Sequence, residues 1–134
     1  GRLDRDSEGL MIFTGDGSLI YKIQRKEFHV EKEYELSTDR ELSRGWLDKL
    51  QRGWKLADKA LLPCKIEKIG VNRYKVILTE GKKRQIRLMF KAAGVKVERL
   101  VRVRIGNITL KGLKEGELRK LSDEEAANLK RLTL

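Results

Sequence analysis

The segment from Cys64 to Thr79 constrains the fold more than any other part of the sequence. Apolar and polar residues alternate in Cys64–Ile69 and again in Tyr74–Thr79, as they do in half-buried β-strands. Between them lie Gly70, Val71, Asn72 and Arg73, which are suited to a tight connection. The pattern therefore predicts a β-hairpin with a four-residue loop.

Other stretches predict strands and helices interleaved along the chain. A single domain is expected for 134 residues, enough to bury a real core. A capping-box pattern at Ser122 and Glu125 predicts the start of the last helix. Strands mixed with helices and joined by hairpins indicate an α+β fold, with flanking helices on a largely antiparallel mixed sheet. The expected strands are 10–14, 32–37 and 95–105, and the expected helices are 18–24, 43–52, 84–93 and 122–132.

The charge balance points to a polyanionic partner. The chain has 31 Lys and Arg against 20 Asp and Glu, a formal net charge of +11. Such an excess on a small domain is typical of nucleic-acid binding, which should weaken as salt rises. A merely basic soluble protein is the alternative.

The single cysteine and single histidine exclude several kinds of site. Because Cys64 is the single cysteine, no internal disulfide can form. Cys64 and His29 lie far apart in the sequence and do not have the spacing of zinc ligands. We interpret Cys64 as a small, half-buried strand residue. No apolar stretch has membrane-spanning length and no signal peptide is visible, so we expect a cytoplasmic protein.

Basic residues gather beside apolar faces in two segments. In the helix expected at 84–93, apolar residues share one face, and Lys83, Arg84, Arg87 and Lys91 follow its flank. In the strand expected at 95–105, simple alternation places Arg102 and Arg104 together on one face. Both sets suit phosphate contacts, and both also suit an ordinary solvated surface.

Three motifs in order resemble those of RsuA-type pseudouridine synthases, which isomerise uridine in bacterial ribosomal RNA. They are the opening GRLDRDSEGLMIFTGDG, the middle VEKEY and the late EGKKRQIRLMF. The first is long and specific, and the other two are short. The resemblance covers almost the whole chain, most weakly between residues 37 and 62, and implies a pseudouridine-synthase-like catalytic core.

The resemblance also implies site residues. Asp4 falls on the catalytic aspartate and Tyr34 on the tyrosine that packs against the target base. Arg87 falls on the arginine that pairs with the aspartate, and Ile86 on the apolar residue beside it. The expected RNA contacts, including Arg2 just before the aspartate, are Arg2, Lys32, Lys83, Arg84, Lys91, Arg102 and Arg104.

Pseudouridine formation moves the uracil from an N1 to a C5 linkage on the ribose without oxidation, so the resemblance implies neither metal nor organic cofactor. It implies ribosomal RNA, or transfer RNA, as the partner, no membrane, and a monomer at full length. The target base must leave its stack to be reached.

Departures from the family pattern concern loops and the chain's start. Gly15 stands where the family usually has Asn, and Lys83 and Leu88 replace an Asn and an Arg. Family members carry catalytic-domain residues and usually an S4-like domain before GRLD. We therefore expect residues 1–134 to be a partial catalytic domain with an exposed sheet edge and with weak or no activity alone. The alternatives are a non-catalytic RNA-binding or ribosome-assembly module, and an interaction domain using the Trp and Leu surfaces.

Overall fold

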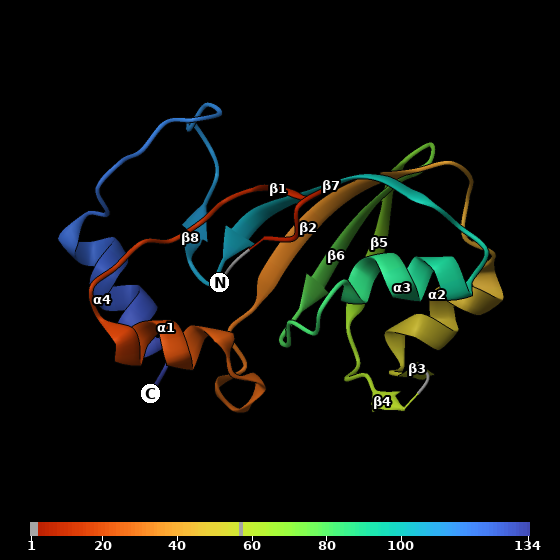
Figure 1. Ribbon diagram of the computed structural model, residues 1–134, viewed down its shortest axis with the longest axis horizontal. Coiled ribbons are helices and arrows are strands. Elements are labelled where there is room, and N and C mark those ends of the chain that lie inside the picture. The colour runs from red at the N-terminus through yellow and green to blue at the C-terminus, as the bar shows by residue number, and fades with distance from the viewer. Residues whose placement is uncertain (1–2, 57) are drawn as a thin grey trace.

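The computed structural model describes residues 3–56 and 58–134, which form an open sheet with helices packed against it (Figure 1). The strand order is β1-β7-β2-β6-β5, with β8 also paired to β7. Among these residues only β1 and β7 pair in parallel, and the other pairs are antiparallel, as expected for this α+β chain. The strands are β1 (Glu8–Gly9), β2 (Lys32–Thr38), β5 (Lys65–Gly70), β6 (Arg73–Leu78), β7 (Val97–Ile105) and β8 (Ile108–Thr109), with a separate pair β3 (Lys55–Leu56) and β4 (Lys59–Ala60).

The helices gather at two ends of the sheet. Figure 1 shows α2 and α3 together below one end, and α1 and α4 together at the other. Side-chain caps begin three of them, from Asp16, Ser43 and Ser122. No helix within residues 3–56 and 58–134 has the length and hydropathy to cross a membrane. The helices are α1 (Gly17–Gln24), α2 (Arg44–Gln51), α3 (Gln85–Ala92) and α4 (Asp123–Arg131), with a short 3₁₀ helix at Lys26–Phe28.

The hairpin expected from the alternating segment is confirmed as β5 and β6, but its predicted four-residue loop is wrong: Gly70 pairs with Arg73, so the connection consists of Val71 and Asn72. Its turn uses Asn72 at φ 51°, a left-handed conformation that Asn tolerates better than most residues. Tyr74, Val76 and Leu78 alternate into the interior. The predicted helices, the strand from Lys32, the long strand ending at Ile105 and the capping box at Ser122 are also confirmed, with boundaries shifted by a few residues.

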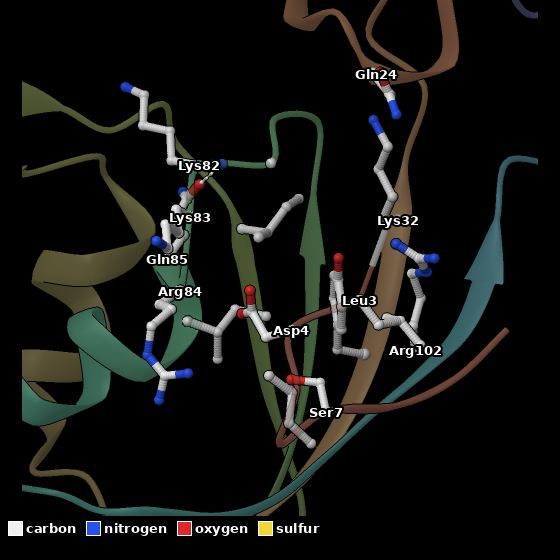
Figure 2. A pocket seen from close by; sticks show the side chains of 15 residues that line it. Leu3, Asp4, Ser7, Gln24, Lys32, Lys82, Lys83, Arg84, Gln85 and Arg102 are labelled. Atoms are coloured by element: carbon white, nitrogen blue, oxygen red, sulfur yellow. Dashed lines mark hydrogen bonds between the residues drawn. The ribbon is translucent and has the colours of Figure 1, made fainter. Parts of the chain in front are cut away.

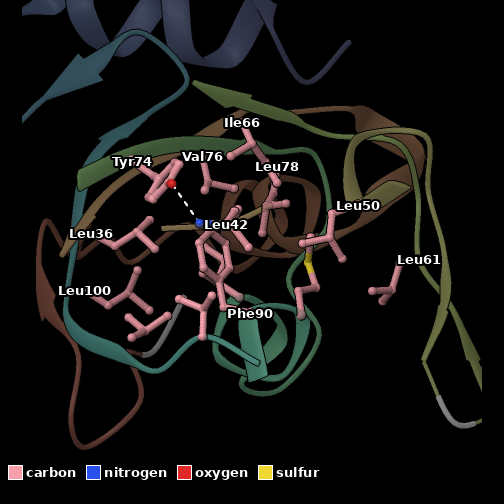
Figure 3. Close-up of a cluster of buried hydrophobic side chains, with 14 residues drawn as sticks. Leu36, Leu42, Leu50, Leu61, Ile66, Tyr74, Val76, Leu78, Phe90 and Leu100 are labelled. Atoms are coloured by element: carbon pink, nitrogen blue, oxygen red, sulfur yellow. Dashed lines mark hydrogen bonds between the residues drawn. The ribbon is translucent and has the colours of Figure 1, made fainter. Parts of the chain in front are cut away.

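A large hydrophobic core lies between the sheet and the pair α2 and α3 (Figure 3). Tyr74 is fully buried, and its hydroxyl donates to Glu41 and accepts from the Leu42 amide at 2.9 Å. Its polar end is thereby satisfied inside the core. The large core consists of Leu36, Leu42, Leu50, Leu61, Ile66, Tyr74, Val76, Leu78, Ile86, Met89, Phe90, Val95, Val97 and Leu100.

A small core at the other end joins α1 and α4 to the ends of β7 and β8. Gly106 is needed there, because its φ is +56° and an added Cβ would come within 2.9 Å of Leu132. The two cores leave the middle of the sheet between them. The small core consists of Leu10, Leu19, Ile23, Val30, Ile105, Ile108 and Leu129.

The prediction of a buried strand at 10–14 is wrong. Leu10 is buried, but Met11 and Phe13 are exposed, and the segment is irregular. The ladder to β7 ends where the Leu10 amide donates to the Arg102 carbonyl at 2.8 Å. An apolar run marks a strand only where a partner strand continues beside it, and among the described residues none does so here.

The prediction that Arg102 and Arg104 share a sheet face is also wrong. Against β7, Glu33 pairs with Arg104 but Tyr34 pairs with Arg102, so Val103 is an extra residue in β7. This β-bulge breaks the alternation of side chains. Arg102 therefore faces the helix-covered side, whereas Arg104 lies with Val103 in a groove elsewhere.

Candidate active site

A cavity of about 390 Å³ opens in the middle of the molecule, between the two cores. Such a volume falls in the range of small-ligand sites. The first residues of the chain, the sheet and the loop before α3 all contribute to it (Figure 2). The lining residues are Leu3, Asp4, Ser7, Gln24, Lys32, Tyr34, Leu78, Gly81, Lys82, Lys83, Arg84, Gln85, Ile86, Leu100 and Arg102.

Asp4 lies at the centre of this cavity, as Figure 2 shows. Its carbonyl accepts from the Ser7 amide at 3.0 Å, closing a turn. Among residues 3–56 and 58–134, its carboxylate has no hydrogen bond or ion pair, although its charge acts on Arg84, and it is the only acidic side chain in the lining. The carboxylate is thus half-buried, held on a turn, and available to a ligand.

Asp6, two residues further on, is held by two arginines of the α3 region. The Arg84 guanidinium donates two hydrogen bonds to the two carboxylate oxygens of Asp6, at 2.9 and 3.0 Å. Arg87 donates to the Asp6 carbonyl at 2.6 Å, and its Nε lies 3.5 Å from the carboxylate. The hydrogen bonds from Arg84, with the charge of Arg87, lower the pKa of Asp6 to about 2.

The expected pairing of Arg87 with Asp4 is not present in the structure. Arg87 is not among the residues that line the cavity, and its guanidinium binds the carbonyls of Asp6 and Val97. The turn explains this, because it directs the Asp4 side chain into the cavity and the Asp6 side chain toward α3. Arg87 therefore holds the segment that carries Asp4 and forms no hydrogen bond or ion pair with the Asp4 carboxylate.

The sheet side of the cavity carries Tyr34 with two buried cations. Tyr34 and Lys32 lie two residues apart on β2, and Tyr34 pairs with Arg102 of β7. Lys32 Nζ donates to the Ile23 carbonyl at 2.6 Å, and Arg102 Nε donates to the Leu10 carbonyl at 2.9 Å. Burial, and secondarily the charge of Arg102, lowers the pKa of Lys32 to about 8.

The α3 side contains Ile86, Lys83 and a network of polar side chains. Glu80 is 3% exposed and accepts from the Leu62 amide at 2.7 Å and from Gln85 Nε2 at 3.0 Å. Lys82 forms an ion pair with Glu80 at 3.4 Å and donates to the Ala60 carbonyl. These bonds fix the loop that precedes α3 against residues 60–62. Ile86 is buried beneath it, and Lys83 is exposed at the rim.

Two predicted RNA contacts lie away from the cavity, and one falls outside the described residues. Lys91 is exposed on the last turn of α3. Arg104 forms ion pairs with Glu31 at 3.1 Å and Glu33 at 3.3 Å. Arg2 lies outside the residues that the structure describes. The cavity thus unites Asp4, Tyr34, Ile86, Lys32, Lys83, Arg84 and Arg102.

Sequence reasoning missed several polar residues of the site, among them Asp6, Ser7 and Glu80. Ser7 lines the cavity, and its buried Oγ has no partner among the described residues. Asp6 could have been considered from the spacing, because it is a second carboxylate two residues after Asp4 and could equally have been the partner of the helix arginines. No local signal distinguishes Glu80 from a surface residue. Within the described chain, no three His, Cys, Asp or Glu side chains gather where they could hold a metal.

Comparisons with known proteins agree with one another. The sequence profile of the family described as "RNA pseudouridylate synthase" matches residues 1–92. A solved structure titled "Crystal structure of pseudouridylate synthase" superposes with a TM-score of 0.91 at 32% identity, over 96% of this chain and 57% of that one.

Curated relatives have similar names. The chain is 41% identical to "Uncharacterized RNA pseudouridine synthase" of Aquifex aeolicus, over 98% of this chain and 56% of the relative. It is 41% identical to "Ribosomal large subunit pseudouridine synthase B" of Buchnera aphidicola, over 87% of this chain and 48% of the relative. It is 36% identical to "Dual-specificity RNA pseudouridine synthase RluF" of Escherichia coli, over 98% of this chain and 46% of the relative. The chain spans about half the length of these relatives.

Proposed function

We propose, from the premise that this chain belongs to the RNA pseudouridylate synthase family, that it isomerises a uridine of ribosomal RNA to pseudouridine. Asp4 is the catalytic carboxylate of this proposal. One observation carries it: among the described residues, the Asp4 carboxylate has no hydrogen bond or ion pair, lies in the same cavity as Tyr34 and Ile86, and is the only acid in the lining.

The reaction breaks the bond from uracil N1 to ribose C1′ and forms a bond from C5 to C1′. N1 gains a proton and C5 loses one, so atoms and electrons balance without an oxidant. The carboxylate of Asp4 acts on this ribose–uracil unit while the base turns. It stands in the centre of the cavity, where a flipped nucleotide would meet it (Figure 2).

Tyr34 and Ile86 provide surfaces for the uracil. Removing a base from its stack costs a few kcal/mol, which contacts inside a pocket offset. An aromatic ring can stack on the base, and its hydroxyl can donate a hydrogen bond. Tyr34 is half-buried on β2, and Ile86 is buried at the start of α3, so both are held by the large core.

Asp6, Arg84 and Arg87 are positioning residues in this proposal. They tie the segment that carries Asp4 to α3 through four contacts of 2.6–3.5 Å. Charge-assisted bonds of this kind are stronger than neutral ones and fix geometry. They set where the Asp4 carboxylate stands relative to the base.

The names of the relatives guide the choice of RNA. One is named for the ribosomal large subunit and another for dual specificity, so we infer large-subunit RNA as the first substrate to try, with transfer RNA second. Such a substrate implies a cytoplasmic enzyme. The relatives are about twice as long as this chain, so we propose that residues 1–134 are part of the catalytic domain. Activity should therefore be measured with the complete gene product.

The test is release of tritium from RNA labelled at uridine C5, because the C5 proton leaves as the new bond forms. The wild-type gene product should release tritium from large-subunit RNA or transfer RNA, and Asp4→Asn should release at least about 10³-fold less. Absence of release from every ribosomal and transfer RNA would refute the proposal.

A second candidate, a non-catalytic RNA-binding module, is favoured by the net charge of +11. The Asp4→Asn variant separates the two functions. A binding module would show the same RNA affinity for both proteins and no tritium release from either. The enzyme would lose tritium release in the variant and keep its RNA affinity.

A further inference from the structure

We propose that Lys32, with Arg102 beside it, forms a subsite for the phosphate of the nucleotide whose base stacks on Tyr34. The inference rests on the proposed function and adds to it the side chain that binds the phosphate of the target nucleotide. Four observations support it: the burial of Lys32, its unused donors, the distribution of charge around the cavity, and the register of β2 and β7.

Lys32 is an unusual buried cation. Only 7% of its surface is exposed, yet its side chain lines the cavity. An ammonium has three donors, and among the described residues it has one acceptor, the Ile23 carbonyl at 2.6 Å. This carbonyl belongs to the last turn of α1, the negative end of that helix. The contact orients Nζ and leaves two donors for a ligand.

No carboxylate of the described chain neutralises Lys32. Neither Asp4 nor any other acid in residues 3–56 and 58–134 forms an ion pair with its ammonium. Instead the charge that acts on it most is that of Arg102, which is 5% exposed on the neighbouring strand. A buried ammonium that has no ion pair among the described residues is costly unless an anion joins it. The sheet side of the cavity is therefore built to receive negative charge.

The register places this charge next to the base. Lys32 and Tyr34 point to the same side of β2 because they are two residues apart, a step of about 7 Å along a strand. Arg102 is the residue opposite Tyr34 on β7. In a nucleotide the base and its phosphate are separated by one sugar ring. A base on Tyr34 then places its ribose near Asp4 and its phosphate near Lys32.

A structural role alone does not explain Lys32. Binding one helix carbonyl uses a single donor, and a neutral side chain in that place would avoid the burial of charge. Titration supports the same view: the pKa of Lys32 is lowered to about 8 by burial, and a bound phosphate would raise it again.

The experiment compares uridine with uridine 5′-monophosphate as probes in NMR titrations of the complete gene product. Neither probe needs turnover. We expect the monophosphate to bind the wild type roughly tenfold more tightly than uridine, the size of one charge-assisted hydrogen bond. In Lys32→Met the preference should fall to about twofold or less, and Lys32→Arg should keep part of it.

The matched control is Lys65→Met, which removes the same charge from an exposed position on β5 outside the cavity. It should keep the tenfold preference. An equal loss in Lys65→Met would show a general charge effect and overturn the proposal. So would an unchanged preference in Lys32→Met, or an equal weakening of uridine and the monophosphate, which would mean that Lys32 binds the base or sugar.

A second measurement needs no variant. The Lys32 ammonium is followed by NMR as pH is raised, with and without probe. The monophosphate should raise the pKa of Lys32 and uridine should not, and no shift with either probe would overturn the subsite. Phosphate preference without tritium release would retain the subsite and refute the enzyme. Tritium release without phosphate preference would support the enzyme and overturn the subsite.

Discussion

The two sides of the cavity both carry cations, but they use them differently. On the α3 side, Arg84 and Arg87 bind Asp6, and Lys82 binds Glu80, so these three cations are paired with carboxylates, and Lys83 lies exposed at the rim. On the sheet side, Lys32 and Arg102 donate to the carbonyls of Ile23 and Leu10. Paired charges fix the shape of a site. The Lys32 ammonium is bound, among the described residues, to a neutral carbonyl only, and therefore keeps its attraction for an anion. The α3 side therefore positions Asp4, and the sheet side binds substrate.

Among changes to the two sides of the cavity, the largest effect is expected from breaking the α3 side at Asp6. Asp6→Asn removes the charge that holds Arg84 and Arg87, so the segment carrying Asp4 loosens. A displacement of about 1 Å can cost about 10²-fold in rate. We expect kcat for tritium release to fall by about that factor, with KM changed by less than about threefold.

The matched control for Asp6→Asn is Asp39→Asn. Asp39 also accepts a backbone hydrogen bond and pairs with an arginine, but it lies at the end of β2 away from the cavity. Its replacement should leave kcat unchanged. An increase in KM with constant kcat in Asp6→Asn would assign Asp6 to substrate binding and contradict its positioning role.

A smaller effect is expected from Arg87. Arg87→Met removes the donors to the Asp6 and Val97 carbonyls but leaves the bidentate bond of Arg84 in place. We expect kcat to fall roughly tenfold. Combined with Asp6→Asn, the loss should be less than the product of the two single losses, because both changes break one connection. Independent, multiplicative losses would show that the two residues act separately.

On the sheet side, removing charge should stabilise the fold. The pKa of Lys32 is lowered by burial from 10.5 to about 8, so holding the ammonium destabilises the folded state. Lys32→Met should raise the free energy of unfolding by about 1–3 kcal/mol at pH 7. Circular dichroism melting, with Lys65→Met as the charge-matched control, measures the difference.

The stabilisation by Lys32→Met should depend on pH. Between pH 8 and 10.5 the unfolded chain binds the Lys32 proton and the folded chain does not, so wild-type stability from this group rises with pH. The gain from Lys32→Met should be largest below pH 8 and shrink toward pH 10.5. The charged groups facing Lys32 are Arg102 on β7 and Asp4 across the cavity. A gain that does not change with pH would show that the buried charge of Lys32 is not its cause.

The smallest effect is expected at Arg104. Two glutamates already balance its charge, and it lies outside the cavity. Arg104→Met should change RNA affinity by less than about twofold, whereas Arg102→Met should weaken it clearly. Binding isotherms at one fixed salt concentration make the comparison. An equal loss in both variants would restore Arg104 as an RNA contact.

Much of the fold and part of the site followed from local patterns. Alternation predicted β5 and β6, and a capping box predicted the start of α4, because both depend on neighbouring residues. The exposed segment after Gly9 and the bulge at Val103 were not predictable, since each depends on which strand lies alongside. The partner of Arg87 was missed for a similar reason. A turn of four residues decides whether Asp4 or Asp6 faces α3.

The most direct test of the central claim is tritium release in a single turnover, with RNA saturating, by the Asp4→Asn protein. The account predicts no detectable release while the affinity for RNA stays within about threefold of wild type, because the substitution removes a charge from the cavity without disturbing either side of it. Release at the wild-type rate would show that the carboxylate in the centre of the cavity is not the group that performs the chemistry.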